Sequence, residues 1–421
     1  MTAKQKILMI GDHPLSTSGV GVQSRFLIHG LLATGRYSFK CFGAALKHEN
    51  LEQIVVTPDF VIKPINGFGD KMLIRQAIMQ EKPDALFLFT DPRFFIHIWE
   101  IEDEIHQACP IVYNHLWDNP PVPAFNQVLY ESTDLINCIN YPTYEMVKKL
   151  LPLRHGDVNY IPHAVPSDLY FPLPEADVMP TRKRLLGDRA DHFVALYVSR
   201  NARRKMPSDI LEGWKTFLDK LESIHGHRKA TILMHTDPMD PEGPNLHHVI
   251  DMLGISDNVV FSKDRVEFPQ MNTLYNSTDV VVNFSSAEGF GLSALEGKMA
   301  GKPLIAMKTG GLTRQVEDHE TGFQYGVGID PEVSSLVGNQ LVPYIYEHLA
   351  SHQTLANAFM KMYEMGPEER TKLGKLAREH ALKYYDINKL VADWDRTLTD
   401  TIERWKKGTM ANNKRWEHVE L

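Results

Sequence analysis

The stretch SSAEGFGLSALEGKMAGKPLIAMKTGG, residues 285–311, decides how this chain should fold. An apolar run, DVVVNFSS, leads into it, a glycine-rich turn AEGFG follows, and LSALEGKMAG then has a helical pattern that Gly301 closes. A strand, a glycine turn and a helix in this order bring backbone N–H groups and the positive end of a helix to the carboxyl edge of a parallel sheet. The stretch therefore predicts an α/β domain with a ligand site at this turn.

Two glutamates in this stretch are not what a buried core helix needs: Glu288 in the turn and Glu296 on the helix. Glu296 would lie roughly 6 Å along the helix axis, from the rise of about 1.5 Å per residue. Gly289 and Gly291 would let the backbone approach a ligand closely. Two acceptors at this spacing suit an extended ligand with hydroxyls at two points and phosphates at the helix end, such as a nucleotide sugar. The alternative is a solvated helix with incidental acids.

Apolar runs of strand length recur along the whole chain with helical patterns between them. Continuous rather than alternating hydrophobicity indicates strands that are buried on both faces of a parallel sheet, so each half should be a doubly wound α/β domain. We expect five segments: an N-terminal domain at 1–175, a linker at 176–190, a second domain at 191–385, a C-terminal helix at 386–409 that packs on the first domain, and a frayed tail at 410–421.

Two further loops follow predicted strands. In FVALYVSRNARRKMPSD, Arg200 and Lys205 come directly after a strand, where two cations suit a diphosphate. Arg203 and Arg204 are interpreted as a solvated basic loop. Near the N-terminus, Gly19 and Gly21 lie in a loop that offers backbone donors, but its spacing does not fit a dinucleotide site.

With these motifs the chain resembles the retaining glycosyltransferases of the GT-B type, close to the fourth family (glycosyl transferases group 1). Glu288 and Glu296 match that family's E-x7-E motif, and Arg200 and Lys205 match its phosphate-binding Arg and Lys. TGGLTRQVEDHETGF, VNYIPHAVPSDLYFPLP and NHLWD match further blocks. The resemblance implies two Rossmann-like domains that face each other across a cleft, with the C-terminal helix crossing back to the first.

The resemblance also implies a role for each matched residue. Glu296 would hold the nucleotide ribose, Glu288 the hydroxyls of the donor sugar, and Arg200 with Lys205 the diphosphate. His115 would point at the sugar near its anomeric carbon, unless it is a core histidine satisfied by its neighbours. The remaining donor-binding residues are backbone positions: Gly19, Gly21, Gly289, Phe290, Gly291, Leu292 and Ser293.

The chain departs from the family pattern at two places, which puts the contacts of both loops in doubt. Ser18 precedes Gly19, where the family often has paired glycines. Ala164, Val165 and Pro166 follow the strand before them, where the family often has Gly-Val-Asp.

The function that the resemblance implies is a hexosyl- or glycosyltransferase that uses a nucleotide sugar such as a UDP- or GDP-sugar, retains the anomeric configuration and needs no metal. The sequence contains no Asp-x-Asp, HExxH or CxxC motif. A paired-carboxylate hydrolase fits less well, because no partner acid can be assigned to Glu288. An epimerase, a phosphorylase with pyridoxal phosphate, and a non-catalytic sugar- or partner-binding protein stay open.

The acceptor is expected to be a saccharide or glycan, while a lipid-linked acceptor and a hydroxylated DNA base are less favoured alternatives that stay open. The formal net charge is −8, and acidic residues outnumber basic ones in both halves, which disfavours phosphate-rich partners. Aromatic side chains in loops of the first domain could stack on a sugar, although such residues are more often core: Phe94, Phe95, Trp99, Trp117 and Phe125.

Three scattered cysteines, Cys41, Cys109 and Cys138, indicate free thiols in a reducing compartment. The N-terminus enters a strand directly and has no signal-peptide pattern, and no run of 18 apolar residues occurs. We therefore expect a cytoplasmic protein without a membrane span, whose oligomeric state the sequence does not indicate.

Overall fold

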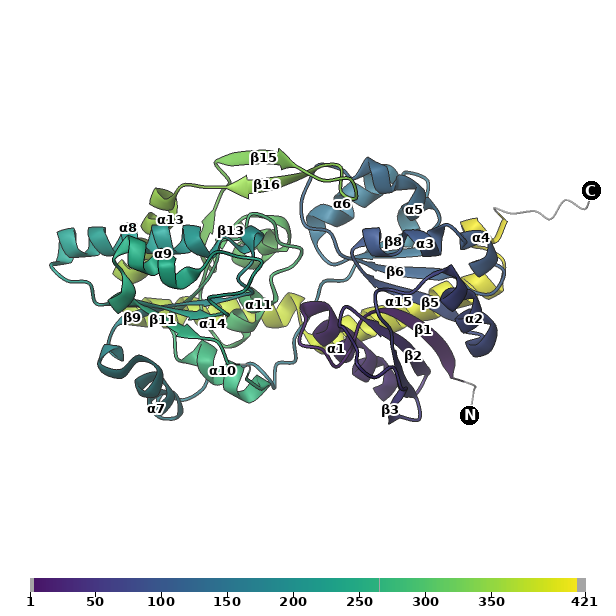
Figure 1. Ribbon diagram of the computed structural model, residues 1–421, viewed down its shortest axis with the longest axis horizontal. Coiled ribbons are helices and arrows are strands. Elements are labelled where there is room, and N and C mark those ends of the chain that lie inside the picture. The colour runs from purple at the N-terminus through teal and green to yellow at the C-terminus, as the bar shows by residue number, and fades with distance from the viewer. Residues whose placement is uncertain (1–3, 265, 415–421) are drawn as a thin grey trace, which may run out of the picture. The chain divides into compact units, whose positions relative to one another are not determined.

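The computed structural model describes residues 4–264 and 266–414, which form two compact α/β units (Figure 1). Unit 1 is made of three stretches of the chain: the part up to Ala164, the segment Gly338–Ile345, and the part that begins at Ile387. Unit 2 consists of Val165–Val337 and Tyr346–Asp386. The two Rossmann-like domains that the sequence predicted are therefore confirmed.

Unit 1 is built on an eight-stranded sheet with the order β3-β4-β2-β1-β5-β6-β7-β8, in which every neighbouring pair is parallel except β3 and β4. The strands are β1 (Gln5–Asp12), β2 (Tyr37–Ala44), β3 (Ile54–Thr57), β4 (Phe60–Pro64), β5 (Ala85–Thr90), β6 (Ile111–His115), β7 (Leu135–Cys138) and β8 (Val158–Tyr160). The helices are α1 (Gly19–Ala33), α2 (Lys71–Glu81), α3 (Ile96–Trp99), α4 (Glu102–Ile105), α5 (Gln127–Glu131), α6 (Tyr141–Leu150) and α15 (Ile387–Lys406).

Both faces of this sheet are buried, which explains the continuous apolar runs. Along β1, Leu8 and Ile10 belong to the core on one face, while Ile7 and Met9 belong to the core on the other. Side chains alternate between the faces of a strand, so a strand covered on both sides must be apolar at every position.

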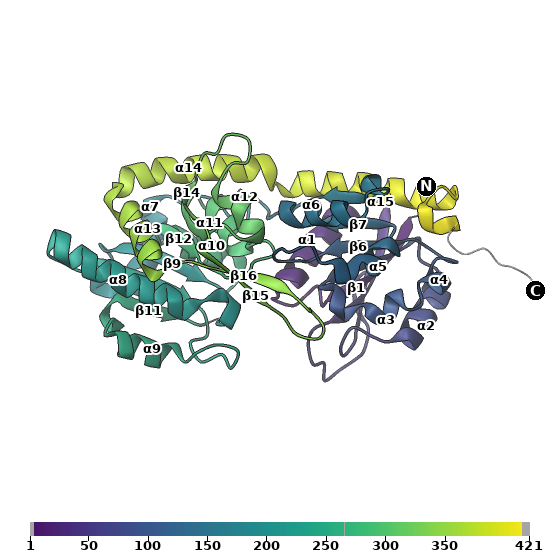
Figure 2. The same cartoon turned by 90° about the horizontal axis from the view of Figure 1, so that it is seen from above.

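The C-terminal helix α15 covers one of these faces (Figure 2). Its buried residues Leu390, Trp394 and Leu398 recur every four positions and form one apolar stripe. The Trp394 ring lies 5.0 Å from the ring of Phe87 on β5. Gly30 of α1 has no side chain at the point where Val391 approaches: an added Cβ would lie 2.1 Å from a Val391 methyl.

Unit 2 has a six-stranded, fully parallel sheet with the order β11-β10-β9-β12-β13-β14. The strands are β9 (Phe193–Val198), β10 (Ala230–His235), β11 (Val259–Ser262), β12 (Val280–Asn283), β13 (Leu304–Met307) and β14 (Gly326–Ile329). The helices are α7 (Glu175–Leu186), α8 (Pro207–His225), α9 (Leu246–Leu253), α10 (Phe268–Asn276), α11 (Leu292–Met299), α12 (Thr313–Val316), α13 (His352–Glu364) and α14 (Gly366–Tyr384).

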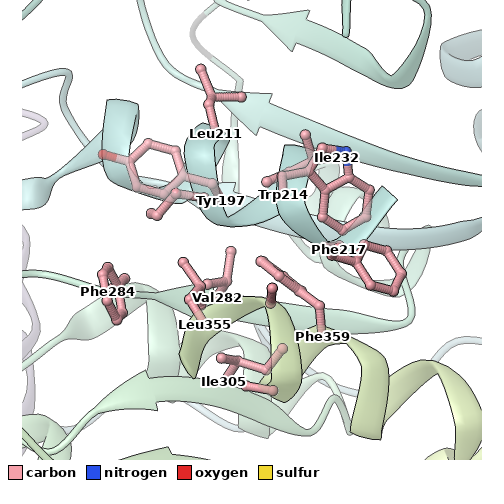
Figure 3. Close-up of a cluster of buried hydrophobic side chains, with 14 of the residues drawn as sticks. Tyr197, Leu211, Trp214, Phe217, Ile232, Val282, Phe284, Ile305, Leu355 and Phe359 are labelled. Atoms are coloured by element: carbon pink, nitrogen blue, oxygen red, sulfur yellow. The ribbon is translucent and has the colours of Figure 1, made fainter. Parts of the chain in front are cut away.

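The core of unit 2 lies where α8 and α13 pack on its sheet (Figure 3). Trp214 and Phe217 of α8 meet Phe359 of α13, with 4.9 Å between the ring centroids of Trp214 and Phe359 in an edge-to-face arrangement. Val282 of β12 and Ile305 of β13 belong to the same buried cluster, so this core fixes the two strands that carry the glycine turns described below.

Three of the expected segments differ from the structure. Most of the expected linker at 176–190 is helix α7, because acids in its first turn and bases in its last turn favour a helix despite Pro180 inside it. The first stretch of unit 1 ends at Ala164, which is earlier than the expected domain boundary at residue 175. The start of the expected frayed tail is also ordered: Met410 and Asn412 are buried, and the Asn412 amide donates to Asp134 at 3.0 Å. Residues 415–421 lie outside the described residues.

A two-stranded sheet that the sequence did not predict follows β14. It consists of β15 (Val333–Val337) and β16 (Ile345–Leu349) and is visible as a separate ribbon in Figure 1. The strands predicted from long apolar runs are present, whereas β2, β3, β4 and β14 were not predicted. All three cysteines are among the described residues, and each is a buried free thiol. None of the described helices has the length and apolar character that a bilayer crossing requires.

Candidate functional site

The glycine turn, residues 284–291, joins β12 to α11 at the carboxyl edge of the unit 2 sheet. Gly291 has φ +90°, and a Cβ there would lie 2.4 Å from the Leu312 side chain. The second glycine turn, residues 309–311, follows β13 and packs against the first. Its Gly311 N–H donates to the Glu288 carbonyl at 3.0 Å, and a Cβ on Gly311 would lie 2.4 Å from Phe290. The positive φ of Gly291 and the close approach of the Phe290 backbone to Gly311 therefore explain the glycines at these two positions.

Helix α11 begins at this turn, and among the described residues no side chain caps its N-terminus. Leu292 and Ser293 in its first turn are half-buried, while Gly289 and Phe290 in the turn are buried. The first N–H groups of a helix and its dipole attract anions, so this end of α11 suits a phosphate or a hydroxyl-rich ligand.

Glu288 and Lys205 form a buried ion pair at the glycine turn. Lys205 belongs to the short turn Arg203–Lys205 after β9, which brings a cation to the same sheet edge. Burial alone would raise the pKa of Glu288, but the positive charges of Lys205 and Arg204 outweigh it and hold that pKa below its usual value. Glu288 is therefore a carboxylate near neutral pH, and the Ser285 hydroxyl lies 3.4 Å from its Oε2.

Arg204 is a residue whose role the sequence analysis missed. Its guanidinium donates to the Ala287 carbonyl at 2.9 Å, and its own carbonyl accepts from the Ser286 N–H at 2.9 Å. It therefore fixes the glycine turn against the cationic turn and is not a purely solvated charge. The basic run Arg203–Arg204–Lys205 was the only local signal in the sequence for this role.

Arg200 does not join the Lys205–Glu288 pair. Its exposed guanidinium binds acids of the loop after β10, with 2.7 Å from Nε to Asp240 and 2.9 Å from NH1 to Glu242. Exposed ion pairs contribute little free energy, so a bound anion could compete for this side chain. The role of Arg200 as a phosphate ligand stays a prediction.

Glu296 lies on α11 in a different environment. Its Oε2 accepts a hydrogen bond from the Tyr275 hydroxyl of α10 at 2.7 Å. Burial raises the pKa of Glu296 to about 7, and the hydrogen bonds from Tyr275 and Tyr170 lower it only in part. No local motif in the sequence indicated either tyrosine, because Tyr275 comes from a neighbouring helix and Tyr170 from the segment that enters unit 2.

Gln315 anchors the glycine turn from behind. Its buried amide donates to the carbonyls of Phe290 at 2.6 Å and Gly291 at 3.2 Å. The buried Lys298 of α11 donates to the Gln315 carbonyl at 2.8 Å and lies 2.6 Å from Nδ1 of His380. Burial lowers the pKa of Lys298 well below its usual value. These residues hold the turn in place from inside the domain.

His115 is the clearest difference between expectation and structure. It ends β6 in the core of unit 1 and is fully buried. Its Nδ1 lies 3.0 Å from the Tyr113 hydroxyl and its Nε2 lies 2.8 Å from the Tyr130 hydroxyl. Burial lowers the pKa of His115 to about 3. Both ring nitrogens are occupied, as in the alternative of a satisfied core histidine, and the role of His115 toward a sugar stays a prediction.

The loop before α1 is closed by its own side chains. Ser18 is the N-cap of this helix: its hydroxyl accepts from the Gly21 N–H at 3.0 Å and donates to Asp12 at 2.6 Å. A Cβ on Gly21 would lie 2.2 Å from the Ser16 hydroxyl, so that glycine is explained by packing. Gly19 is the first residue of the helix. The amide of Gly21, predicted to bind the donor, is used inside the loop.

The structure of unit 1 also explains the second departure from the family pattern, at Ala164, and the positions of the aromatic residues proposed to stack on a sugar. The Ala164 carbonyl accepts from the Gln23 amide at 2.9 Å. Phe95 and Trp99 are core residues that pack on Tyr113. Trp117 is buried, Phe125 is half-buried, and Phe94 is 40% exposed. Of the five proposed stacking residues, Phe94 is the most accessible.

Acidic, histidine and cysteine side chains do not gather into a cation-binding group anywhere in residues 4–264 or 266–414. The chemistry assembled at the glycine turn of unit 2 comprises one buried carboxylate held by a lysine, a second acid with a raised pKa, and a helix N-terminus.

Residues 180–337 match the family model described as glycosyl transferases group 1. A D-inositol 3-phosphate glycosyltransferase from Paenarthrobacter aurescens is 28% identical over 225 residues, which is 53% of this chain and 46% of the relative. The chain thus spans about half the length of that curated relative.

Solved structures resemble the whole chain. Sucrose-phosphate synthase from Thermosynechococcus elongatus superimposes with a TM-score of 0.71 and 18% identity, covering 95% of this chain and 100% of that one. Anabaena HepE, whose structure is in complex with UDP and glucose, superimposes with a TM-score of 0.69 and 17% identity, covering 94% and 99%. At these identities the likeness establishes the fold, which is the GT-B class of two Rossmann-like domains.

Proposed function

We propose that this protein transfers a sugar from a nucleotide-diphosphate sugar to an acceptor hydroxyl, because residues 180–337 match the family model described as glycosyl transferases group 1. The observation that carries the proposal is the buried Lys205–Glu288 ion pair, which lies at the glycine turn where α11 begins. A cation, a carboxylate and a helix N-terminus in one place suit a ligand that carries both phosphates and hydroxyls.

In this proposal Glu288 accepts hydrogen bonds from hydroxyls of the sugar that is transferred. Lys205, with Arg200 once a ligand displaces its exposed acidic partners, binds the diphosphate. Glu296 accepts from the nucleotide ribose, and the backbone from Gly289 to Ser293 donates to sugar and phosphate oxygens. The family resemblance supports these roles, and the separate environments of the two glutamates agree with separate ligand groups.

In this proposal the positive charge at the glycine turn assists catalysis by stabilising the leaving group. When the bond between the anomeric carbon and the diphosphate breaks, negative charge grows on the leaving phosphate. Lys205 and the N-terminus of α11 stabilise that charge because they are already in place before the reaction begins. The same charges do the work that a divalent cation does elsewhere, so we propose transfer without a metal and, from the resemblance, with retention of configuration.

We propose a saccharide or a phosphorylated polyol as the acceptor. The names of the Paenarthrobacter relative and of sucrose-phosphate synthase each refer to a small phosphorylated sugar or polyol. The net charge of −8 disfavours a polyanionic acceptor such as DNA.

Thermal unfolding with a panel of UDP-, GDP- and ADP-sugars tests the donor assignment. A ligand at about 100 times its Kd should stabilise the protein by about 2.7 kcal/mol, and its melting temperature should rise. Mass spectrometry of acceptor mixtures with that donor then identifies the product, and NMR of its anomeric proton reports the configuration. Activity should survive EDTA. If millimolar nucleotide sugars leave the melting temperature unchanged, the donor assignment is wrong.

A further inference from the structure

Strand β16 of the two-stranded sheet contacts both glycine turns through one histidine, His348. Its backbone N–H donates to the Ser286 carbonyl of the glycine turn at 2.8 Å. Its ring Nδ1 lies 2.9 Å from the hydroxyl of Thr309, which opens the second glycine turn. The family match ends at Val337, so β16 lies beyond the matched region and the E-x7-E motif gives no information about His348.

The two contacts of His348 reach residues that hold Glu288. Ser286 also donates its N–H to the Arg204 carbonyl at 2.9 Å. The second glycine turn returns to Glu288 through the Gly311 N–H, which donates to the Glu288 carbonyl at 3.0 Å. His348 therefore links two turns that meet again at the backbone of Glu288: its backbone N–H contacts the first turn and its imidazole contacts the second.

A neighbouring residue attaches the same strand to the cationic turn. Glu347 forms an ion pair with Arg203, with 2.8 Å between NH1 and Oε2. The exposed Arg203–Glu347 pair holds the strand weakly, because solvent screens it. The bond to Thr309 is different: Thr309 is fully buried and the imidazole is half-buried, so the hydrogen bond between them fixes a definite geometry.

The imidazole is suited to this task because it stays uncharged. Burial lowers the pKa of His348 below its ordinary value, so the ring is neutral at physiological pH. A neutral ring can exchange one directed hydrogen bond with the Thr309 hydroxyl without adding a positive charge at the glycine turns.

We propose that His348 is a positioning residue for sugar transfer. Through Thr309 it fixes the second glycine turn against Glu288, and so sets the position of that carboxylate relative to the sugar. The inference rests on the proposed function, because its readout is turnover of a nucleotide sugar, but it concerns a residue and a strand to which the family motifs give no role.

A double-mutant cycle tests the proposal. His348→Ala removes the ring, and Thr309→Val removes the hydroxyl while it keeps the shape of the side chain. Each should lower kcat roughly three- to tenfold, as expected for the loss of one hydrogen bond. The double variant should be no worse than the worse single variant, because both changes remove the same contact. The Kd of free nucleoside diphosphate should stay within about twofold, since its proposed ligands are unchanged.

Conservative replacement separates positioning from a general loss of structure. His348→Asn places a polar atom near the position of Nδ1 and should restore most of kcat. His348→Gln places its amide near Nε2 instead and should behave like His348→Ala. The matched control is His352→Ala: His352 lies four residues further on, contacts Asp209 at 3.1 Å on the surface, and should leave kcat unchanged.

Additive losses in the double variant, or a kcat that His348→Ala leaves at the wild-type value, would overturn the proposal. Loss of activity that only follows a lowered melting temperature, with no rescue by Asn, would overturn it as well. If the wild-type protein binds no nucleotide sugar, the proposed function itself fails. If the wild-type protein turns over a nucleotide sugar and the His348 variants all have the wild-type kcat, only the proposed role of His348 fails.

Discussion

The glycine turn and the first turns of α11 carry two glutamates in opposite electrostatic states. Glu288 is held by Lys205, and its pKa is lowered. Glu296 accepts from the Tyr275 hydroxyl, and burial raises its pKa to about 7. The two acids are eight positions apart in one motif, yet one is a fixed carboxylate and the other titrates near neutral pH. Neighbours from distant parts of the chain therefore decide what each acid can do.

The largest expected effect comes from removing the cation that defines the Glu288 environment. Lys205→Met leaves a buried carboxylate unpaired, and we expect a loss of about 2–4 kcal/mol in the free energy of unfolding at neutral pH. The folded-state pKa of Glu288 is lowered by this pair, so the stabilisation is present above the unfolded pKa and disappears as the pH falls through the folded value. Urea unfolding at a series of pH values measures both.

The double variant Lys205→Met/Glu288→Gln is the control for this prediction, because it removes both charges. It should recover part of the lost stability, as expected when no charge is left buried without a partner. A Lys205→Met variant as stable as the wild type would show that the pair is not buried in solution, and the contrast between the two glutamates would be lost.

The second effect separates the roles of the two acids in turnover. If Glu288 holds the sugar that is transferred, Glu288→Gln weakens a contact that strengthens as charge develops at the anomeric carbon. We expect kcat to fall roughly tenfold to a hundredfold, from about 1.5–3 kcal/mol for a hydrogen bond to a charged group. Steady-state kinetics gives kcat, and calorimetry should find the Kd of free nucleotide nearly unchanged. A variant that changed Kd alone would give Glu288 the role proposed for Glu296.

The third effect is the opposite pattern at Glu296. If this residue holds the ribose, Glu296→Ala removes binding that is present in both the ground state and the transition state. The KM for the donor should rise by about tenfold while kcat changes little. Initial rates over a range of donor concentrations measure the two constants. Equal, small effects from Glu288→Gln and Glu296→Ala would contradict both roles and would indicate that the stretch is an ordinary helix cap with no ligand contact from either acid.

A further expected effect is a pH dependence specific to Glu296. Its folded pKa of about 7 lies above the usual value for a glutamate, so the protonated form favours folding. This contribution is complete below the unfolded pKa and is lost as the pH rises through about 7, a change on the order of 1–3 kcal/mol. Glu296→Gln should flatten this part of the stability profile, which thermal unfolding between about pH 5 and 8 measures.

Donor binding should show the reverse trend, because only the carboxylate form of Glu296 accepts two hydrogen bonds from a ribose. The affinity for a nucleotide sugar should rise through about pH 7 in the wild type and stay flat in Glu296→Gln. A wild-type affinity that does not change over this range would place the pKa of Glu296 elsewhere and remove the contrast with Glu288.

Much of this site could be predicted because its signals are local. The strand, the glycine turn and helix α11 are contiguous, and the positive φ of Gly291 favours a glycine in the turn. Lys205 was predictable because a cation directly after a strand must lie at the carboxyl edge of a parallel sheet. The resemblance then supplied roles for these positions, which the structure alone does not assign.

Other parts were not predictable, since they depend on contacts between distant segments. His115 belongs to a matched block, yet Tyr113 and Tyr130 occupy both of its ring nitrogens. Arg200 shares a motif with Lys205, but the loop after β10 places Asp240 beside its guanidinium. His348 is separated from Ser286 by more than sixty residues, and no sequence pattern near it indicates a site.

By itself, the sequence determined the two α/β domains and the turn that carries Glu288, because continuous apolar runs and glycine spacing act through short-range geometry. Only the tertiary structure decided the charge state of each acid, the burial of His115, and the attachment of β16 to the glycine turns. The physical reason is that pKa values and hydrogen-bond partners depend on burial and on neighbours in space, which a linear spacing of residues does not specify.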